Sequence, residues 1–234
     1  MRNLIIFGLF VMAMIFVQFA QAQTVDEVLD KNIAAMGGRE KLGSLKTVKM
    51  EGNMSVQGFD LAITSTKSHM IGVRLDFDVN GTSNYQIVNA TKGSVFMPVQ
   101  GMDAPQDMEP DQYKSTVTQM DLQGTFCNYK EKGTTIELQG KETVDGSEAY
   151  KLKVTFKNGV AATYYIDTKT NRVIKTSATM NVGGQDMEVT TSYSDYKQNA
   201  DGFWFAYTVV TQRGTITYDK ITTNMPVDES IYKN

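Results

Sequence analysis

Few side chains in this 234-residue chain could take part in acid–base, nucleophilic or metal chemistry. His69 is the only histidine and Cys127 the only cysteine, which excludes most multi-histidine metal sites and any triad that needs a second histidine in support. His69 stands at the start of a predicted strand, and we interpret it as a surface residue. Cys127 is interpreted as a small buried hydrophobe and not as a nucleophile.

Carboxylates gather in two places where they could bind a cation or act in pairs. One proline-rich segment holds Asp103, Asp107, Glu109 and Asp111. Their spacing lacks the glycine and the terminal glutamate of a calcium-binding loop. Asp76 and Asp78 share a strand face like a glycosidase pair, but strand faces in water carry such charges routinely. We therefore expect no catalytic residue, no metal site and no cofactor.

The charge balance also limits the partners. The chain has 23 lysines and arginines against 26 aspartates and glutamates, for a net charge of −3. The lysines are scattered and form no basic face that could neutralise phosphates. No nucleic-acid partner is expected.

Helical spacing opens the part of the chain that follows an apolar N-terminus. Thr24 and Glu27 fit a capping box, and apolar residues recur at helical spacing until Gly37-Gly38. A shorter helical stretch is expected from Arg39 to Leu45. An amphipathic helix is thus predicted before the first strand.

From Thr47 the hydrophobic period changes to two, which is typical of antiparallel strands with one buried face. In one such run Leu75 and Phe77 share the apolar face, while Arg74 and Asp76 share the opposite one. Dipeptides that favour tight hairpin turns separate the runs: Asn80-Gly81, Asp145-Gly146, Asn158-Gly159 and Gly183-Gly184. The pattern predicts about ten or eleven strands in one domain.

The segment Pro98 to Gln123 departs from this pattern. It contains three of the four prolines, and after Pro110 the apolar residues approximate a helical stripe. Asp111 would lie in the first turn, where the helix dipole favours negative charge. We predict a proline-rich loop followed by one internal helix.

These elements predict an all-β fold with a few helices: a half-open antiparallel β-barrel of about ten or eleven strands with an N-terminal helix and an internal lid helix. A sheet of that size curls, and two or three helices cannot cover it if it is flat. A wide barrel leaves interior volume, so an apolar ligand or a collapsed lid is needed to fill it. Methionines cluster in the lid region, where they suit variable apolar partners or simply fill gaps in the core.

The N-terminus reads as an export signal. Arg2 precedes an apolar run that ends on Ala20-Gln21-Ala22, the layout of a cleavable signal peptide, and no cysteine follows it for lipid attachment. We expect a signal peptide at residues 1–22 and one domain at residues 23–234. The protein is then expected in the periplasm of a Gram-negative envelope, soluble and monomeric.

Phrases in the second half of the chain resemble a known family. They are Asn128-Tyr129-Lys130-Glu131-Lys132-Gly133, Gly140-Lys141-Glu142, Tyr164-Tyr165-Ile166-Asp167, Asn171-Arg172, Tyr193-Ser194-Asp195-Tyr196, Asp201-Gly202-Phe203-Trp204-Phe205 and Pro226-Val227-Asp228-Glu229-Ser230-Ile231-Tyr232. The chain resembles the outer-membrane lipoprotein-sorting proteins of the LolA-like superfamily, especially the Bacteroidetes forms. The resemblance extends over nearly the whole chain after the signal peptide.

The resemblance implies an incomplete barrel with a helical lid and an apolar cavity that carries lipoprotein acyl chains between membranes without a cofactor. Inner- and outer-membrane transfer proteins would be its partners. In the best-known carriers a strand arginine holds the lid shut, and Arg74 is the nearest candidate for such a latch. The residues expected at the cavity and lid are Met97, Met102, Met108, Tyr113, Val117, Met120, Leu122, Leu75, Phe77 and Trp204. Trp204 also fits a core anchor.

Three hypotheses remain beside a periplasmic carrier of lipoprotein acyl chains or another lipid. The chain could be an envelope protein-interaction module whose barrel is filled by its own lid and holds no ligand. A small integral barrel fits less well, because the polar face is rich in lysine and the first helix is amphipathic. An enzyme comes last, because no donor and acceptor set is assembled.

Overall fold

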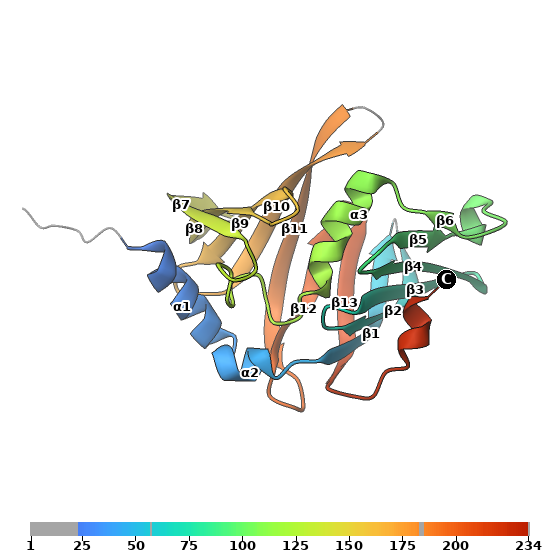
Figure 1. Ribbon diagram of the computed structural model, residues 1–234, viewed down its shortest axis with the longest axis horizontal. Helices are drawn as coiled ribbons and strands as arrows, with labels where there is room; N and C mark the ends of the chain where they lie inside the picture. The colour runs from blue at the N-terminus through green and yellow to red at the C-terminus, as the bar shows by residue number, and fades with distance from the viewer. Residues whose placement is uncertain (1–22, 57, 183–184, 234) are drawn as a thin grey trace, which may run out of the picture.

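A single open sheet of antiparallel strands dominates the structure (Figure 1). The computed structural model describes residues 23–56, 58–182 and 185–233. The predicted signal peptide at residues 1–22 and the predicted Gly183-Gly184 turn lie outside the described residues. Within the described ranges, no helix is long and apolar enough to cross a membrane.

The sheet consists of two meanders joined edge to edge. The strands are β1 (Thr47–Val56), β2 (Phe59–Ser68), β3 (Gly72–Val79), β4 (Thr82–Asn89), β5 (Gly93–Phe96), β6 (Gln106–Asp107), β7 (Thr135–Val144), β8 (Ser147–Thr155), β9 (Ala161–Asp167), β10 (Val173–Val182), β11 (Gln185–Gln198), β12 (Trp204–Thr211) and β13 (Gly214–Thr223). Their order is β6-β5-β4-β3-β2-β1-β13-β12-β11-β10-β9-β8-β7. The two edge strands, β6 and β7, do not pair in this order, so the barrel stays open. The predicted fold class is confirmed, with thirteen described strands in place of ten or eleven.

Local signals determine the elements that the sequence predicted. Helix α1 (Val25–Ala35) starts with the expected capping box, in which Glu27 N donates to Thr24 Oγ1 at 3.2 Å and Thr24 N donates to Glu27 Oε2 at 3.1 Å. Helix α2 (Arg39–Gly43) follows after the glycine pair. At the β3–β4 turn both Asn80 and Gly81 take positive φ, which a two-residue hairpin of this kind requires. These predictions are confirmed.

Bulges bend the sheet so that one face becomes concave. The register of β1 against β13 shifts between Glu51 and Gly52. A Cβ on Gly52 would lie 2.1 Å from the backbone oxygen of Thr217, so this close approach requires glycine. Bulges increase local twist and curvature. The concave face therefore owes part of its shape to one glycine.

The proline-rich segment crosses the concave face. It contains the 3-10 helix η1 (Pro98–Gln100), helix α3 (Pro110–Thr116) and the 3-10 helix η2 (Val117–Met120). Contacts of α3 with β10 and of η2 with β3 and β4 place this lid across the opening between the two halves of the sheet (Figure 1). The predicted internal helix is confirmed, whereas the short strand β6 was not predicted.

Three apolar clusters form the core on the concave side. The first packs α1 against β8 and β9, around Leu29, Leu152 and Ile166. The second joins Leu45 and Val48 to Phe203 and Ile221, with Leu122 and Phe205 packed against it. The third packs the lid on β3 and β4 through Val73, Val88, Met108 and Met120. The helices and the lid thus cover most of the concave face.

Candidate functional site

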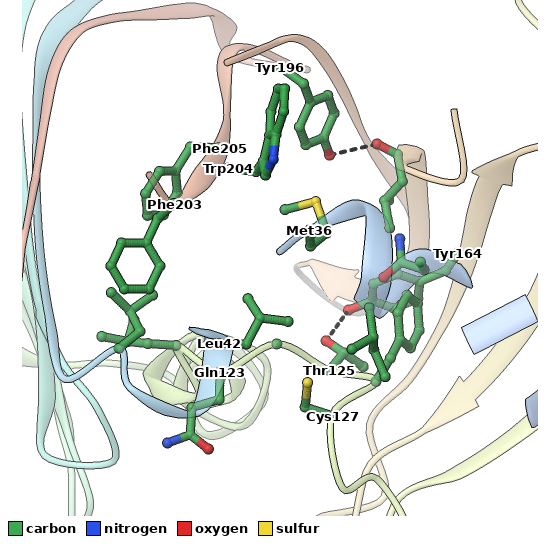
Figure 2. Close-up of a pocket in the computed structure, with 17 residues that line it drawn as sticks. Met36, Leu42, Gln123, Thr125, Cys127, Tyr164, Tyr196, Phe203, Trp204 and Phe205 are labelled. Carbon is green, nitrogen blue, oxygen red and sulfur yellow. Dashed lines mark hydrogen bonds between the residues drawn. The ribbon is translucent and has the colours of Figure 1, made fainter. Parts of the chain in front are cut away.

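An apolar pocket lies between the two N-terminal helices and the strands β9 to β12. Its volume is about 230 Å³. Figure 2 shows its walls: Phe203, Trp204 and Phe205 on one side, Tyr164 on the opposite side, and Leu42 and Cys127 near the segment that leaves the lid. Helix α1 contributes Ile33, and its C-cap residue Met36 also lines the pocket. Most of this lining is hydrocarbon, which favours an apolar ligand.

The hydroxyl groups on the pocket wall are hydrogen-bonded within the protein. Tyr196 Oη donates to the backbone oxygen of Val173 at 2.7 Å, and the hydroxyls of Tyr164 and Thr125 share a hydrogen bond at 3.2 Å (Figure 2). Burial raises the pKa of Tyr164 to about 12 and also raises the pKa of Tyr196. Both phenols stay neutral at physiological pH, so neither supplies a general base.

Arg172 supports the aromatic wall from behind. Its guanidinium carbon lies 3.8 Å from the centroid of the Trp204 ring and 5.5 Å from that of Tyr196. Its Nη2 donates to the backbone oxygen of Ala35 at 3.5 Å, in the last turn of α1. The aromatic ring attracts the cation through its π face, and the negative end of the helix dipole attracts it as well. Arg172 thereby fixes the Trp204 ring relative to α1.

The contacts of the only cysteine and the only histidine indicate structural roles. Cys127 is 5% exposed and lines the pocket, and burial raises the pKa of its thiol. The interpretation of Cys127 as a buried hydrophobe is confirmed. His69 is not the surface residue that the sequence suggested, because its side chain is partly buried and its Nδ1 accepts from Leu122 N at 3.2 Å. The histidine holds the segment that leaves the lid.

The structure places the predicted cavity and lid residues in three locations. Leu122 and Trp204 line the pocket. Met108, Tyr113, Val117 and Met120 pack with the third cluster, and Leu75 and Phe77 continue the same face of β3. Met97 and Met102 flank η1 beside the strand edge, where Met97 O accepts from Met102 N. Met108 and Met120 thus form core against β3 and β4, away from the pocket.

Arg74 lies on the face opposite to the lid. Its Nε donates to both carboxylate oxygens of Asp76 at 2.9 Å, and its Nη1 donates to the backbone oxygen of Ile231 at 3.2 Å. Ile231 belongs to the 3-10 helix η3 (Glu229–Tyr232), near the C-terminus. The guanidinium also stacks on the Tyr85 ring, at 4.7 Å from its centroid. These contacts join Arg74 to the C-terminal segment.

Most of the pocket wall was not among the residues that the sequence predicted. Phe126, Tyr164, Tyr196, Phe203 and Phe205 were not predicted to line a cavity. All but Phe126 occur in the aromatic phrases that carry the family resemblance, so the signal was present but was interpreted as structural. The pocket residues on α1 and α2 could not be recognised from the sequence, because their position depends on how the helices pack on the strands.

Comparisons with known proteins support the fold. No protein-family model matches the sequence, and a search of curated proteins gives no match. A DUF1329 family protein from Desulfovibrio piger matches with a TM-score of 0.58 and 14% identity, over 89% of this chain and 97% of its own. A LolA superfamily protein from Nitrosomonas europaea matches with a TM-score of 0.57 and 12% identity, over 90% and 98%.

A third solved structure is described as an outer membrane lipoprotein-sorting protein domain from Vibrio parahaemolyticus. It matches with a TM-score of 0.53 and 14% identity, over 88% of this chain and 95% of its own. Identities this low carry the architecture and not the ligand. The chain thus has the fold of LolA superfamily proteins and lipoprotein-sorting domains, which confirms at the level of the fold the resemblance seen in its sequence.

Proposed function

We propose that this protein is a periplasmic carrier that binds lipoprotein acyl chains or another lipid in the apolar interior of its half-barrel and moves them toward the outer membrane. The observation that carries the proposal is the aromatic and aliphatic pocket between α1, α2 and β9 to β12. At about 0.8 kcal/mol for each buried CH₂ group, such a surface can bind a hydrocarbon chain without any catalytic group.

Binding of a full acyl chain in this pocket would require the lid to move. Ligand pockets usually measure about 300 to 1,000 Å³, and an apolar cavity of about 150 Å³ holds benzene. At about 230 Å³, the closed pocket has room for a short length of chain only. Full acyl chains require the interior to widen. Leu122 lines the pocket directly after η2, so lid displacement would open the pocket itself.

A few polar contacts hold the lid in place. Met70 N donates to Met120 O at 2.9 Å, Tyr113 Oη donates to Asn89 O at 3.1 Å, and Asn158 Nδ2 donates to Lys114 O at 2.8 Å. Each bond contributes about 1 kcal/mol net. Together with the Met108 and Met120 packing, they are weak enough for cargo binding to offset. The lid is therefore suited to exchange between closed and open positions.

A second function is favoured by one observation. Met120 is 2% exposed and Met108 is 7% exposed, so the lid already fills the β3–β4 half of the interior. A protein whose lid stays closed would be an envelope interaction module without a lipid ligand. Transfer proteins in the inner and outer membranes would be partners of the carrier but not of this module.

Uptake of an uncharged apolar fluorophore, N-phenyl-1-naphthylamine, separates the two functions. The carrier predicts saturable uptake that added lipid reverses, and weakening by about tenfold or more in Trp204→Ala, because the ring forms one wall of the pocket. Phe59→Ala is the matched control, since Phe59 is 73% exposed at the start of β2. Absence of uptake by the wild-type protein would favour the interaction module.

A further inference from the structure

Lys67 points into the concave interior. On β2 it pairs with Val48 of β1 and with Val73 of β3. Directly opposed residues in neighbouring strands share a face of the sheet. Val48 is 2% exposed and Val73 is 6% exposed, and they belong to the second and third core clusters. The lysine side chain therefore enters the interior between these two clusters.

The ammonium group of Lys67 has no partner within the described part of the chain. No hydrogen bond or ion pair involves it there, although the side chain is only partly exposed. The segment between η2 and the pocket carries one acid, Asp121. Its carboxylate is already 2.6 Å from Lys132 Nζ and 3.9 Å from His69 Nδ1. The protein thus provides a cation in its interior and no anion for it.

An unpaired interior cation is unfavourable for folding alone. Burial lowers the pKa of Lys67 to about 8, so the group is still mostly protonated at neutral pH. The partly buried Arg74, in contrast, is paired with Asp76 at 2.8 Å. A perturbed and unpaired charge inside a concave surface marks a candidate functional site.

A continuous apolar cluster lies between Lys67 and the pocket. Its partner Val48 belongs to the second cluster, against which Leu122 and Phe205 pack. Both of these residues also line the pocket. Once the lid is displaced, a hydrocarbon chain that starts in the pocket would extend along this cluster toward β2.

We propose that Lys67 Nζ binds the anionic head group of a single-chain amphiphile, a carboxylate or a phosphate monoester, whose hydrocarbon chain lies along the second cluster and in the pocket. This inference rests on the proposed carrier function and gives its cargo a charge. The ammonium donates charge-assisted hydrogen bonds to the head-group oxygens, which satisfies both ions. The ligand thereby supplies the missing anion.

Competition against N-phenyl-1-naphthylamine at pH 7 tests the inference. The competitors are hexadecanoic acid, its uncharged methyl ester and hexadecyl phosphate. The wild-type protein is expected to bind at least one of the two anions about tenfold or more tighter than the ester. The tighter of the two anions identifies the head group as carboxylate or phosphate.

Three variants show whether Lys67 causes this preference. Lys67→Met should bind both anions no better than the ester, and Lys67→Arg should keep the preference. Lys153→Met, which changes an exposed lysine on β8, should behave like wild type. Equal binding of acid and ester by the wild-type protein would overturn the inference and leave the carrier function intact. Binding of none of the three competitors would overturn both.

Discussion

Replacement of Lys67 by methionine should make the ligand-free protein more stable, and the gain should depend on pH. The pKa of this lysine is lowered from 10.5 to about 8 by burial. Each pH unit of such a difference corresponds to about 1.4 kcal/mol. The protonated side chain therefore destabilises the folded state by about 3 kcal/mol at pH 7. Lys67→Met removes this charge and keeps a long apolar side chain in the same place.

The sign of the pH dependence follows from the order in which the two states lose the proton. Below pH 8 the folded and unfolded chains both carry the proton, so the wild-type protein bears the full destabilisation. As pH rises from 8 toward 10, the folded chain loses the proton first, and wild-type stability should rise by about 2 to 3 kcal/mol. The methionine variant lacks this rise. The advantage of the variant should therefore shrink over the same range.

Urea unfolding of both proteins at pH 7, 8, 9 and 10 measures this difference directly. Comparison of the two proteins cancels the groups that they share, and Lys153→Met controls for loss of an exposed lysine. A variant no more stable than wild type at pH 7 would refute the burial of the ammonium. So would an advantage that stays constant up to pH 10.

Three other substitutions or conditions give further expectations. Met120→Ala should lower the free energy of unfolding by about 2 to 5 kcal/mol in urea, because Met120 is 2% exposed beneath the lid; a loss below 1 kcal/mol would contradict this packing. Gly72→Ala should release the C-terminal segment, because the new Cβ would lie 2.4 Å from the Tyr232 ring; unchanged hydrogen exchange of residues 229–233 would argue against it. Burial raises the pKa of Tyr164 and Tyr218 to about 12 and also raises that of Tyr196, so the stability that these phenols contribute is complete below pH 10 and is lost as pH rises further; absorbance at 295 nm should show a late-titrating group of phenols, and ionisation of all tyrosines near pH 10 would exclude this.

The fold was predictable wherever a few neighbouring residues determine the backbone. The Thr24 capping box and the Asn80-Gly81 turn depend on residues within one helical turn or one hairpin, and both occur as predicted. The strand count was too low by two or three, and the short β5 and β6 account for part of the difference. A strand of two residues, such as β6, has no period that a sequence pattern could reveal.

The pocket was less predictable because contacts between distant segments create it. Asn32 Nδ2 on α1 donates to the backbone oxygen of Asn171 at 2.7 Å, which fixes the helix over β9 and β10. No local pattern specifies this approach. The lid methionines illustrate a second difficulty. A flexible side chain such as Met120 suits either a cargo surface or a core gap, and only the packing shows that it fills the core.

Arg74 and Lys67 show how far alternation along a strand can locate a charged residue. Alternation on β3 placed Arg74 opposite the apolar face, where the structure also has it. Alternation along β2 did not identify Lys67 as an interior residue, because Ser65 two positions before it and His69 two positions after it are polar too. Only the register with Val48 and Val73 shows that Lys67 faces the interior.

Native mass spectrometry of the protein, purified without detergent from cells that express it, tests the carrier function most directly. The account predicts a bound species whose mass is lost on organic extraction and is identified in the extract as a lipid or an acylated peptide. A single ligand-free mass, together with no uptake of N-phenyl-1-naphthylamine, would contradict the carrier and leave the lid-filled interaction module as the better explanation.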